Sequence, residues 1–469
     1  MEGRDLTRGS VPRLLLVSTL PVLASFILQS LYALADLYFV GFLGGAALAG
    51  VGISINTFFL VIALGQTIGS GALAFISQAY GRKDPARITA VFGQTFWLTI
   101  GLGAVLWAAG WFFAETYFDL FTADAEVRLE GLSYFRIYCA TFLIQTFLIV
   151  CGACWRATGN FVLPTLLMGG NVLLNLALDP LLIFGWGPVP AFGVAGAAWA
   201  TVIAQGLAMG VYFWLILLSP RNTLLRVRLP IRLSAGLVAR QLRIGLPAGA
   251  QMLLATVALA MTYRAVRPYG ADATAAVGVG FRLLQSAIFP AVAVGAACAS
   301  MVGQNHGAGM GTRVRQTVGW AMALALLVMG VELTALLTAP DFWIGLFAAE
   351  PGVISIGARY LTINGFGHAL VAYSLIATFS SQAMGRTLRP LLAVTSRVAL
   401  YLALLLAVDA WYRPWLDGVF WAHLAAMILE AALMTWILAG LFRATVAVPL
   451  GAVSAPRQEA DTTAGSAAP

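Results

Sequence analysis

The chain has 469 residues, of which 60% are hydrophobic and only 10% are charged, and its mean hydropathy is +0.88. This composition excludes a water-soluble domain for most of the chain and indicates an integral membrane protein surrounded by lipid. The formal net charge of +8 does not indicate a nucleic-acid partner, because the basic residues are distributed over alternate loops instead of forming one patch.

The apolar runs predict the membrane-spanning helices, since each crossing needs about 20 mainly apolar residues. The first run is too long for a cleaved signal peptide and is expected to be retained. We therefore predict an all-α protein with twelve transmembrane helices. Reading between the charged and Pro/Gly-rich breaks places them at 12–41, 46–78, 88–113, 132–155, 161–184, 193–217, 237–266, 273–303, 315–339, 354–383, 389–410 and 418–444.

The loops between these spans predict the orientation. Basic residues, such as Arg82, Arg156 and Arg313, follow the second, fourth and eighth spans, and the intervening loops are poor in base or acidic. The positive-inside rule then places both termini in the cytoplasm of a multi-pass protein of the plasma (inner) membrane. Arg264 and Arg267 are the main exception, because they fall on the outer side.

The sequence also repeats itself, which predicts two homologous bundles of six helices. Both halves have the same orientation because six is even, so a pseudo-twofold axis along the membrane normal relates them, as in many secondary transporters. We expect an N-terminal lobe at 1–218, a cytoplasmic linker at 219–243, a C-terminal lobe at 244–450 and a disordered cytoplasmic tail at 451–469. An offset of 226 residues pairs Pro21 with Pro247, Gly44 with Gly270, Gln78 with Gln304, Gly81 with Gly307, Tyr134 with Tyr360 and Pro164 with Pro390.

The fifth span carries polar residues at a spacing of four. Asn171, Asn175 and Asp179 lie along one side of a helix at this spacing. A charged group facing hydrocarbon costs at least ~2.5 kcal/mol, so this side should face a polar cavity inside the lobe. The alternative is that the asparagines only join helices through hydrogen bonds, which explains Asp179 less well.

Asp36 in the first span supports a cavity. At ~1.5 Å per residue, Asp36 and Asp179 both lie roughly 7 to 9 Å below the outer end of their helices. Two acids at one depth are expected either to exchange a proton or, with the oxygen of Asn175, to hold a sodium ion. The offset pairs Asp36 with Thr262 and Asp179 with Leu405, so the acids occur in one half only. This asymmetry favours a coupling-ion site over a structural ion pair, for which no basic partner is evident.

Four segments carry a resemblance to a known family. They read WRATGNFVLP, NVLLNLALDPLLIFG, GVAGAAWATVIAQ and, in the first span, ADLYFVGFLGGAALAGVG. With them the chain resembles the multidrug and toxic compound extrusion (MATE) family, DinF-like branch, over nearly its whole length. The resemblance implies a V-shaped fold of two lobes and the export of cationic or amphipathic drug-like compounds in exchange for H⁺ or Na⁺. The alternative is a lipid-linked glycan flippase of the same wider superfamily, which should have a more basic central cavity.

The resemblance also implies roles for individual residues. Asp36, Asn175 and Asp179 would couple the cation, joined by Tyr134 and by Thr201, which is placed by the local pattern WATVIAQ. Apart from the coupling ion we expect no cofactor and no enzymatic activity, since no GxxxxGK[ST] motif is present. Drug-like small molecules and membrane lipid are the expected partners, and a monomer is the expected state.

The C-terminal half departs from the NorM-like branch of the family. Ala255 stands where a glutamate would be expected, and His368 lies near the usual aspartate, where a packed, hydrogen-bonded histidine is the alternative to a titrating one. Arg282 corresponds to Asn56 in the repeat and is expected in the cleft between the lobes, unless it reaches the interface or pairs with Glu332.

Three further expectations concern the cleft, the hinge and the membrane charges. The predicted substrate cavity comprises Gln29, Tyr32, Arg282 and His368. Pro21 shares a span with Asp36 and lacks a backbone N–H, so it is either a hinge that responds to the acids or a static kink. Arg397 and Glu430 are expected to form an ion pair within the membrane.

Overall fold

The computed structural model describes residues 3–219, 224–227, 234–411 and 415–446. The predicted tail at 451–469 and parts of the predicted linker at 219–243 lie outside these residues. Long apolar runs form the helices, and turn residues end them. For example, Gly44 precedes the second helix with a φ of 107°, and Asp84 caps the third by accepting a hydrogen bond from the Arg87 N–H (3.0 Å).

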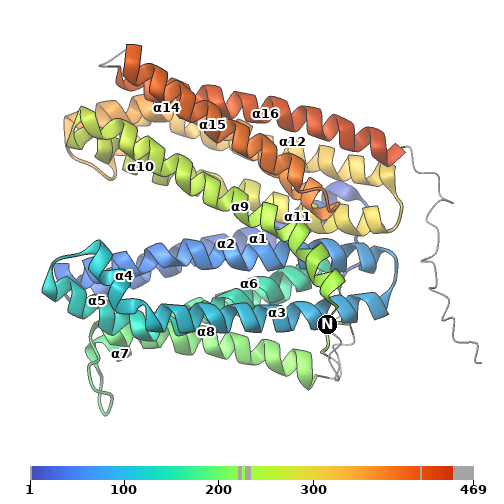
Figure 1. The fold of residues 1–469 in the computed structure, drawn as a ribbon, viewed down its shortest axis with the longest axis horizontal. Coiled ribbons are helices and arrows are strands. Elements are labelled where there is room, and N and C mark those ends of the chain that lie inside the picture. Colours follow the sequence, from blue (N-terminus) through green and yellow to red (C-terminus); the bar gives the residue numbers. More distant parts are fainter. Residues whose placement is uncertain (1–2, 220–223, 228–233, 412–414, 447–469) are drawn as a thin grey trace, which may run out of the picture.

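The first half of the chain forms the N-terminal lobe (Figure 1). Its helices are α1 (Val11–Gly41), α2 (Gly45–Gly81), α3 (Pro85–Phe112), α4 (Ala114–Phe121), α5 (Ala125–Tyr138), α6 (Ala140–Ala157), α7 (Val162–Phe184) and α8 (Val194–Leu217).

The second half forms the C-terminal lobe. Its first long helix begins within the range predicted as linker. The elements are α9 (Ala235–Val266), the 3₁₀ turn η1 (Arg267–Tyr269), α10 (Ala271–Ala287), α11 (Phe289–Gly307), α12 (Gly311–Thr338), α13 (Pro340–Gly345), α14 (Pro351–Ala383), α15 (Leu388–Trp411) and α16 (Leu416–Val446).

The described residues contain twelve helical segments long and apolar enough to cross a membrane, so the predicted all-α membrane fold is confirmed. Two predicted spans are corrected in detail. The span at 132–155 is not one helix, because the chain breaks at Cys139 between α5 and α6, and neither proline nor glycine marks this break. The span at 273–303 breaks at Ile288, where the following Pro290 supplies no backbone N–H.

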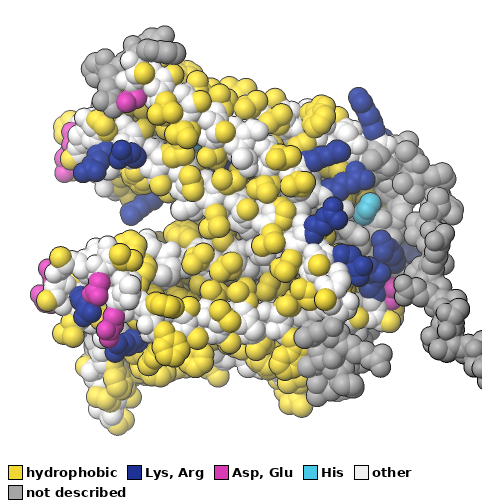
Figure 2. Space-filling model, in the orientation of Figure 1, with side chains coloured by type: hydrophobic (Ala, Val, Ile, Leu, Met, Phe, Trp, Pro, Cys, Tyr) yellow, Lys and Arg dark blue, Asp and Glu magenta, His cyan; other side chains and the backbone are white. Residues whose placement is uncertain are grey.

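The two lobes form a V. Figure 1 shows them converging at the end that holds the N-terminus and separating towards the opposite end, and Figure 2 shows the hollow between them there. α2 packs against α9 and α11 of the other lobe, and α11 packs against α1 and α2. Figure 2 also shows Lys and Arg side chains gathered at the converging end. We call the contact at this end the seam and the hollow at the other end the cleft.

The seam is built from residues that the repeat pairs with each other. The Gln78 Nε2 amide donates to the Ala383 carbonyl across the seam (2.8 Å), and the Gln304 Nε2 amide donates to the Ala157 carbonyl (3.0 Å). The offset of 226 residues pairs Gln78 with Gln304 and Ala157 with Ala383, so the two bonds occupy equivalent places in the repeat. The two bonds are therefore mates across the pseudo-twofold axis, which must pass through the seam.

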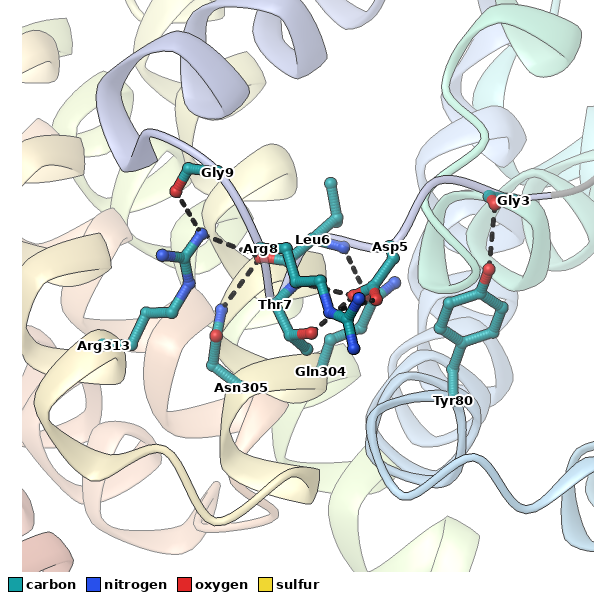
Figure 3. Close-up of polar contacts among 10 residues, drawn as sticks. All are labelled: Gly3, Asp5, Leu6, Thr7, Arg8, Gly9, Tyr80, Gln304, Asn305 and Arg313. Atoms are coloured by element: carbon teal, nitrogen blue, oxygen red, sulfur yellow. Dashed lines mark hydrogen bonds and ion pairs between the residues drawn. The ribbon is translucent and has the colours of Figure 1, made fainter.

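A short N-terminal segment, residues 3–9, crosses the seam (Figure 3). The Leu6 N–H donates to Gln304 Oε1 (2.9 Å), and Asn305 Nδ2 donates to the Leu6 carbonyl (3.4 Å). On the side of the N-terminal lobe, the Tyr80 hydroxyl donates to the Gly3 carbonyl (2.9 Å). The Leu6 side chain is fully buried. The segment thus contacts both lobes where they meet.

Candidate functional site

The predicted acids lie in a buried polar cluster within the N-terminal lobe. Asp36 comes from α1, and Asn175 and Asp179 come from α7, which packs directly against α1. Asn175 and Asp179 are fully buried, and Asp36 is buried as well. Asp36 and Asp179 are close enough to interact electrostatically. The spacing of four on α7 therefore turns its polar side inward, as the sequence predicts.

The cluster contains several oxygen atoms that accept no hydrogen bond. Asn175 Nδ2 donates to Asp179 Oδ1 (3.2 Å), but the other Asp179 oxygen has no partner. The amide oxygens of Asn171 and Asn175 and one carboxylate oxygen of Asp36 are buried without a donor too. A buried acceptor without a donor costs about 1–3 kcal/mol. A proton or a hard cation would relieve this cost, and both suit oxygen donors.

Hydroxyl groups from three helices border the acids. The Tyr32 hydroxyl on α1 and the Thr201 hydroxyl on α8 are 2.9 Å apart and share a hydrogen bond. Tyr134 on α5 is buried, and its ring stacks on Tyr138 with centroids 5.1 Å apart. Asp36 lies near all three tyrosines. The structure thus brings Tyr134 and Thr201 to the acids, and it places Tyr32, predicted for the substrate cavity, in the same cluster.

Two residues that lie one helical turn from predicted members of the cluster were not predicted. Tyr138 follows Tyr134 by one helical turn, and Gln205 follows Thr201 by one turn with its side-chain oxygen buried and unpaired. The spacing of four that identified α7 was available for both pairs. Neither pair includes an acid, whereas Asp179 marked the polar side of α7.

The corresponding region of the C-terminal lobe is already satisfied internally. The Thr262 and Tyr401 hydroxyls, at the repeat positions of Asp36 and Asn175, bond to each other (2.8 Å). His368 is buried, and its Nδ1 lies 3.2 Å from the Asn364 carbonyl oxygen. This geometry agrees with the packed alternative for His368. No acid from α9 or α15 enters this network within the described residues.

The other intramembrane charges divide into two cases. Arg397 and Glu430 form the expected ion pair, with Nη1 and Oε2 2.9 Å apart. Arg282 is exposed on α10 and belongs to none of the ion pairs found in the described part of the chain, so the pairing with Glu332 is absent there. Gln29 is partly exposed on α1, and neither it nor Arg282 reaches the buried cluster through a hydrogen bond.

Comparison with known proteins identifies the chain. The MatE family model matches residues 21–181 and, again, residues 247–407, so each lobe carries one copy beginning at the paired Pro21 and Pro247. The chain belongs to the MATE family. Two relatives are "Probable multidrug resistance protein YoeA" of Bacillus subtilis (strain 168) and an "FAD transporter" of Shewanella oneidensis.

The extent of these matches supports the assignment. The Bacillus subtilis relative is 31% identical over 394 residues, which is 82% of this chain and 84% of the relative. The Shewanella oneidensis relative is 25% identical over 89% of this chain and 91% of its own length. A solved structure described as the outward-facing conformation of a multidrug resistance MATE family transporter superposes with a TM-score of 0.87. It is 21% identical, covering 95% of this chain and 99% of that one, and it confirms the V-shaped MATE fold.

Proposed function

We propose that this MATE protein is a secondary active antiporter that exports small amphipathic or cationic organic compounds in exchange for H⁺ or Na⁺. The observation that carries the proposal is the cluster of unpaired buried oxygens around Asp36 and Asp179. A buried carboxylate pair without a basic partner is costly and is retained where a cation must be taken up and released. No acid stands at either repeat position, Thr262 or Leu405, so coupling belongs to one lobe.

The cluster offers either ion a suitable set of donors. A proton would bind one carboxylate and remove the repulsion between Asp36 and Asp179. A sodium ion would instead take oxygens from Asp36, Asn175 and Asp179, with Asn171 one turn away on α7. In both cases binding changes the charge next to Tyr32 and Thr201, whose hydrogen bond joins α1 to α8. Ion binding can thereby alter how α1 sits in its lobe.

We further propose that the seam faces the cytoplasm and the cleft faces the outside of the inner membrane. The basic loops and the N-terminus support this orientation by the positive-inside rule. The described conformation is then open outward, and the transport cycle requires the seam to separate. The two lobes within one chain supply both sides of the cleft, which supports a monomeric transporter.

The test is drug efflux from proteoliposomes under separately imposed gradients. Ethidium is loaded into vesicles that contain the purified protein, and a proton gradient or a sodium gradient is applied alone. We expect one of the two gradients to accelerate ethidium movement above that in protein-free vesicles. Movement that neither gradient accelerates would contradict antiport, and acceleration by only one identifies the ion.

We also propose that Pro21 acts as a hinge in α1, which gives a second expected result. Pro21 lies inside α1 and provides no N–H for the carbonyl of Val17, while its own carbonyl accepts a hydrogen bond from Thr165 of α7 (2.7 Å). In Pro21→Ala, the regained backbone bond, worth about 0.5–1.5 kcal/mol, should stiffen α1 and slow ethidium export. The paired Pro247→Ala change serves as control, because the position on α9 that corresponds to Asp36 holds Thr262 and no acid. A Pro21→Ala rate equal to the parent rate would remove the hinge.

A further inference from the structure

One side of α10 is polar although the helix lies in a membrane span. α10 packs on α14 through small and apolar residues such as Val277, Gly280 and Leu284. The opposite side exposes Arg282, Gln285 and Ser286. A charged and two polar residues exposed together on a membrane helix indicate contact with water instead of lipid.

The polar side faces the other lobe. α10 and α11 together form one span, and Ile288 between them keeps helical backbone angles (φ −79°, ψ −17°). Gly280 of α10 and Gly295 of α11 both abut α14, so the same side of the span continues across Ile288. Residues separated by a whole number of turns lie on the same side of a helix. Gly307 follows Arg282 by 25 residues, about seven turns of 3.6 residues, and Gly303 follows Gln285 by 18 residues, about five turns. Both glycines abut α2 in the seam, next to Gln78 and Ser77. Arg282 and Gln285 therefore continue the seam side of this span upward into the cleft.

An aromatic pair joins the two lobes below these residues. Phe26 of α1 and Phe289 of α11 stack across the lobe boundary, with ring centroids 5.3 Å apart and planes inclined by 7°. Both rings are only partly buried. Gln285 lies about one turn, and Arg282 about two turns, above Phe289 along the span.

The depth of Arg282 excludes the usual explanation for a membrane arginine. Arg282 lies about 16 Å from Ala271, the first residue of α10, at 1.5 Å per residue. An extended arginine side chain is shorter than this, so it cannot reach the outer end of the helix. Arg282 also forms no ion pair with an acid of the described residues. Its charge therefore remains available to a molecule in the cleft.

We propose that Arg282, Gln285 and the Phe26–Phe289 pair form a binding site for flat aromatic molecules that carry a carboxylate. The guanidinium of Arg282 offers a planar pair of donors that matches a carboxylate, and Gln285 adds a hydrogen-bonding group one turn below. The partly exposed rings offer an apolar surface for the flat part of the molecule. The site would widen the substrates of the proposed exporter from cations to aromatic acids, and it rests on that function for its transport role.

The experiment is equilibrium binding to the purified full-length protein in detergent, measured by calorimetry with two matched probes. The probes are 2-naphthoate and 2-(aminomethyl)naphthalene, which share the aromatic part and differ in charge. We expect Arg282→Gln to weaken naphthoate binding by about tenfold or more and to leave the amine unaffected. Arg282→Lys should recover part of the loss, because it keeps the charge but not the planar pair of donors. Phe289→Ala should weaken both probes.

Arg264→Gln provides the matched control, since Arg264 is an exposed arginine at the end of α9. Naphthoate binding that is absent in the parent, or equal in Arg282→Gln and the parent, would overturn the site. An equal loss for both probes would assign Arg282 a structural role instead. Because binding is measured without a gradient, Asp36→Asn should still bind naphthoate. A failure of antiport in the ethidium assay is therefore distinguishable from a failure of this site.

Discussion

Replacing Asp36 or Asp179 with asparagine should slow gradient-driven export by about tenfold or more while the protein still folds and inserts. Asparagine has the same shape but cannot take up a proton, and it offers a sodium ion no negative charge. The neutral side chain also removes the cost of a buried acid without a basic partner, so the fold should not suffer. We expect the acceleration of ethidium efflux by the effective gradient to fall by about tenfold or more in each variant.

The control for this prediction is Glu126→Gln, an exposed acid in the first turn of α5. It removes the same charge from the same lobe and should leave coupling unchanged. Ethidium exchange without a gradient separates loss of coupling from loss of substrate binding. If the double variant Asp36→Asn, Asp179→Asn exports ethidium at the parent rate, the buried cluster does not couple transport.

Alanine at Gly81 and Gly307 should keep the seam from closing. A Cβ at Gly81 would overlap the Gln304 carbonyl oxygen, and a Cβ at Gly307 would overlap the Gln78 carbonyl oxygen. Both clashes involve backbone of the other lobe, which cannot move aside as a side chain does. Overpacking of this kind costs about 1–3 kcal/mol per site. We expect the double variant to populate a conformation with a separated seam and to transport ethidium poorly.

The seam can be measured directly by the distance between spin labels at Ala86→Cys and Thr312→Cys, two exposed positions near the start of α3 and α12. The distance should increase in the double alanine variant. Gly206→Ala and Gly319→Ala are the controls, because a Cβ at either helical position meets nothing within 4 Å. An unchanged label distance together with parent transport rates would show that the seam tolerates the added methyl groups.

The fold was largely predictable because its determinants are local or repeated. Apolar runs of sufficient length had to cross the membrane, and the offset of 226 residues already paired Gln78 with Gln304 before their bonds across the seam were known. The break at Cys139 was not predictable, since no proline or glycine lies next to it. The stacking of Phe26 on Phe289 depends on how the lobes dock, which no local pattern encodes.

The candidate site was predictable only in part. Helical spacing placed Asn171, Asn175 and Asp179 on one side of α7, because that periodicity is a property of the helix itself. Which helices would face them depends on tertiary packing. Thr201 was therefore reached through the family resemblance, and Tyr138 was not predicted.

The buried position of Leu6 makes the N-terminal segment a natural reporter of the transport cycle. The four native cysteines, Cys139, Cys151, Cys154 and Cys298, are all buried in the helical lobes. A thiol introduced at Leu6 would be shielded from a water-soluble maleimide while the lobes touch, and would react once they part. A bulky affinity tag fused just ahead of Gly3 would press on that same junction, so purification handles belong at the other end of the chain.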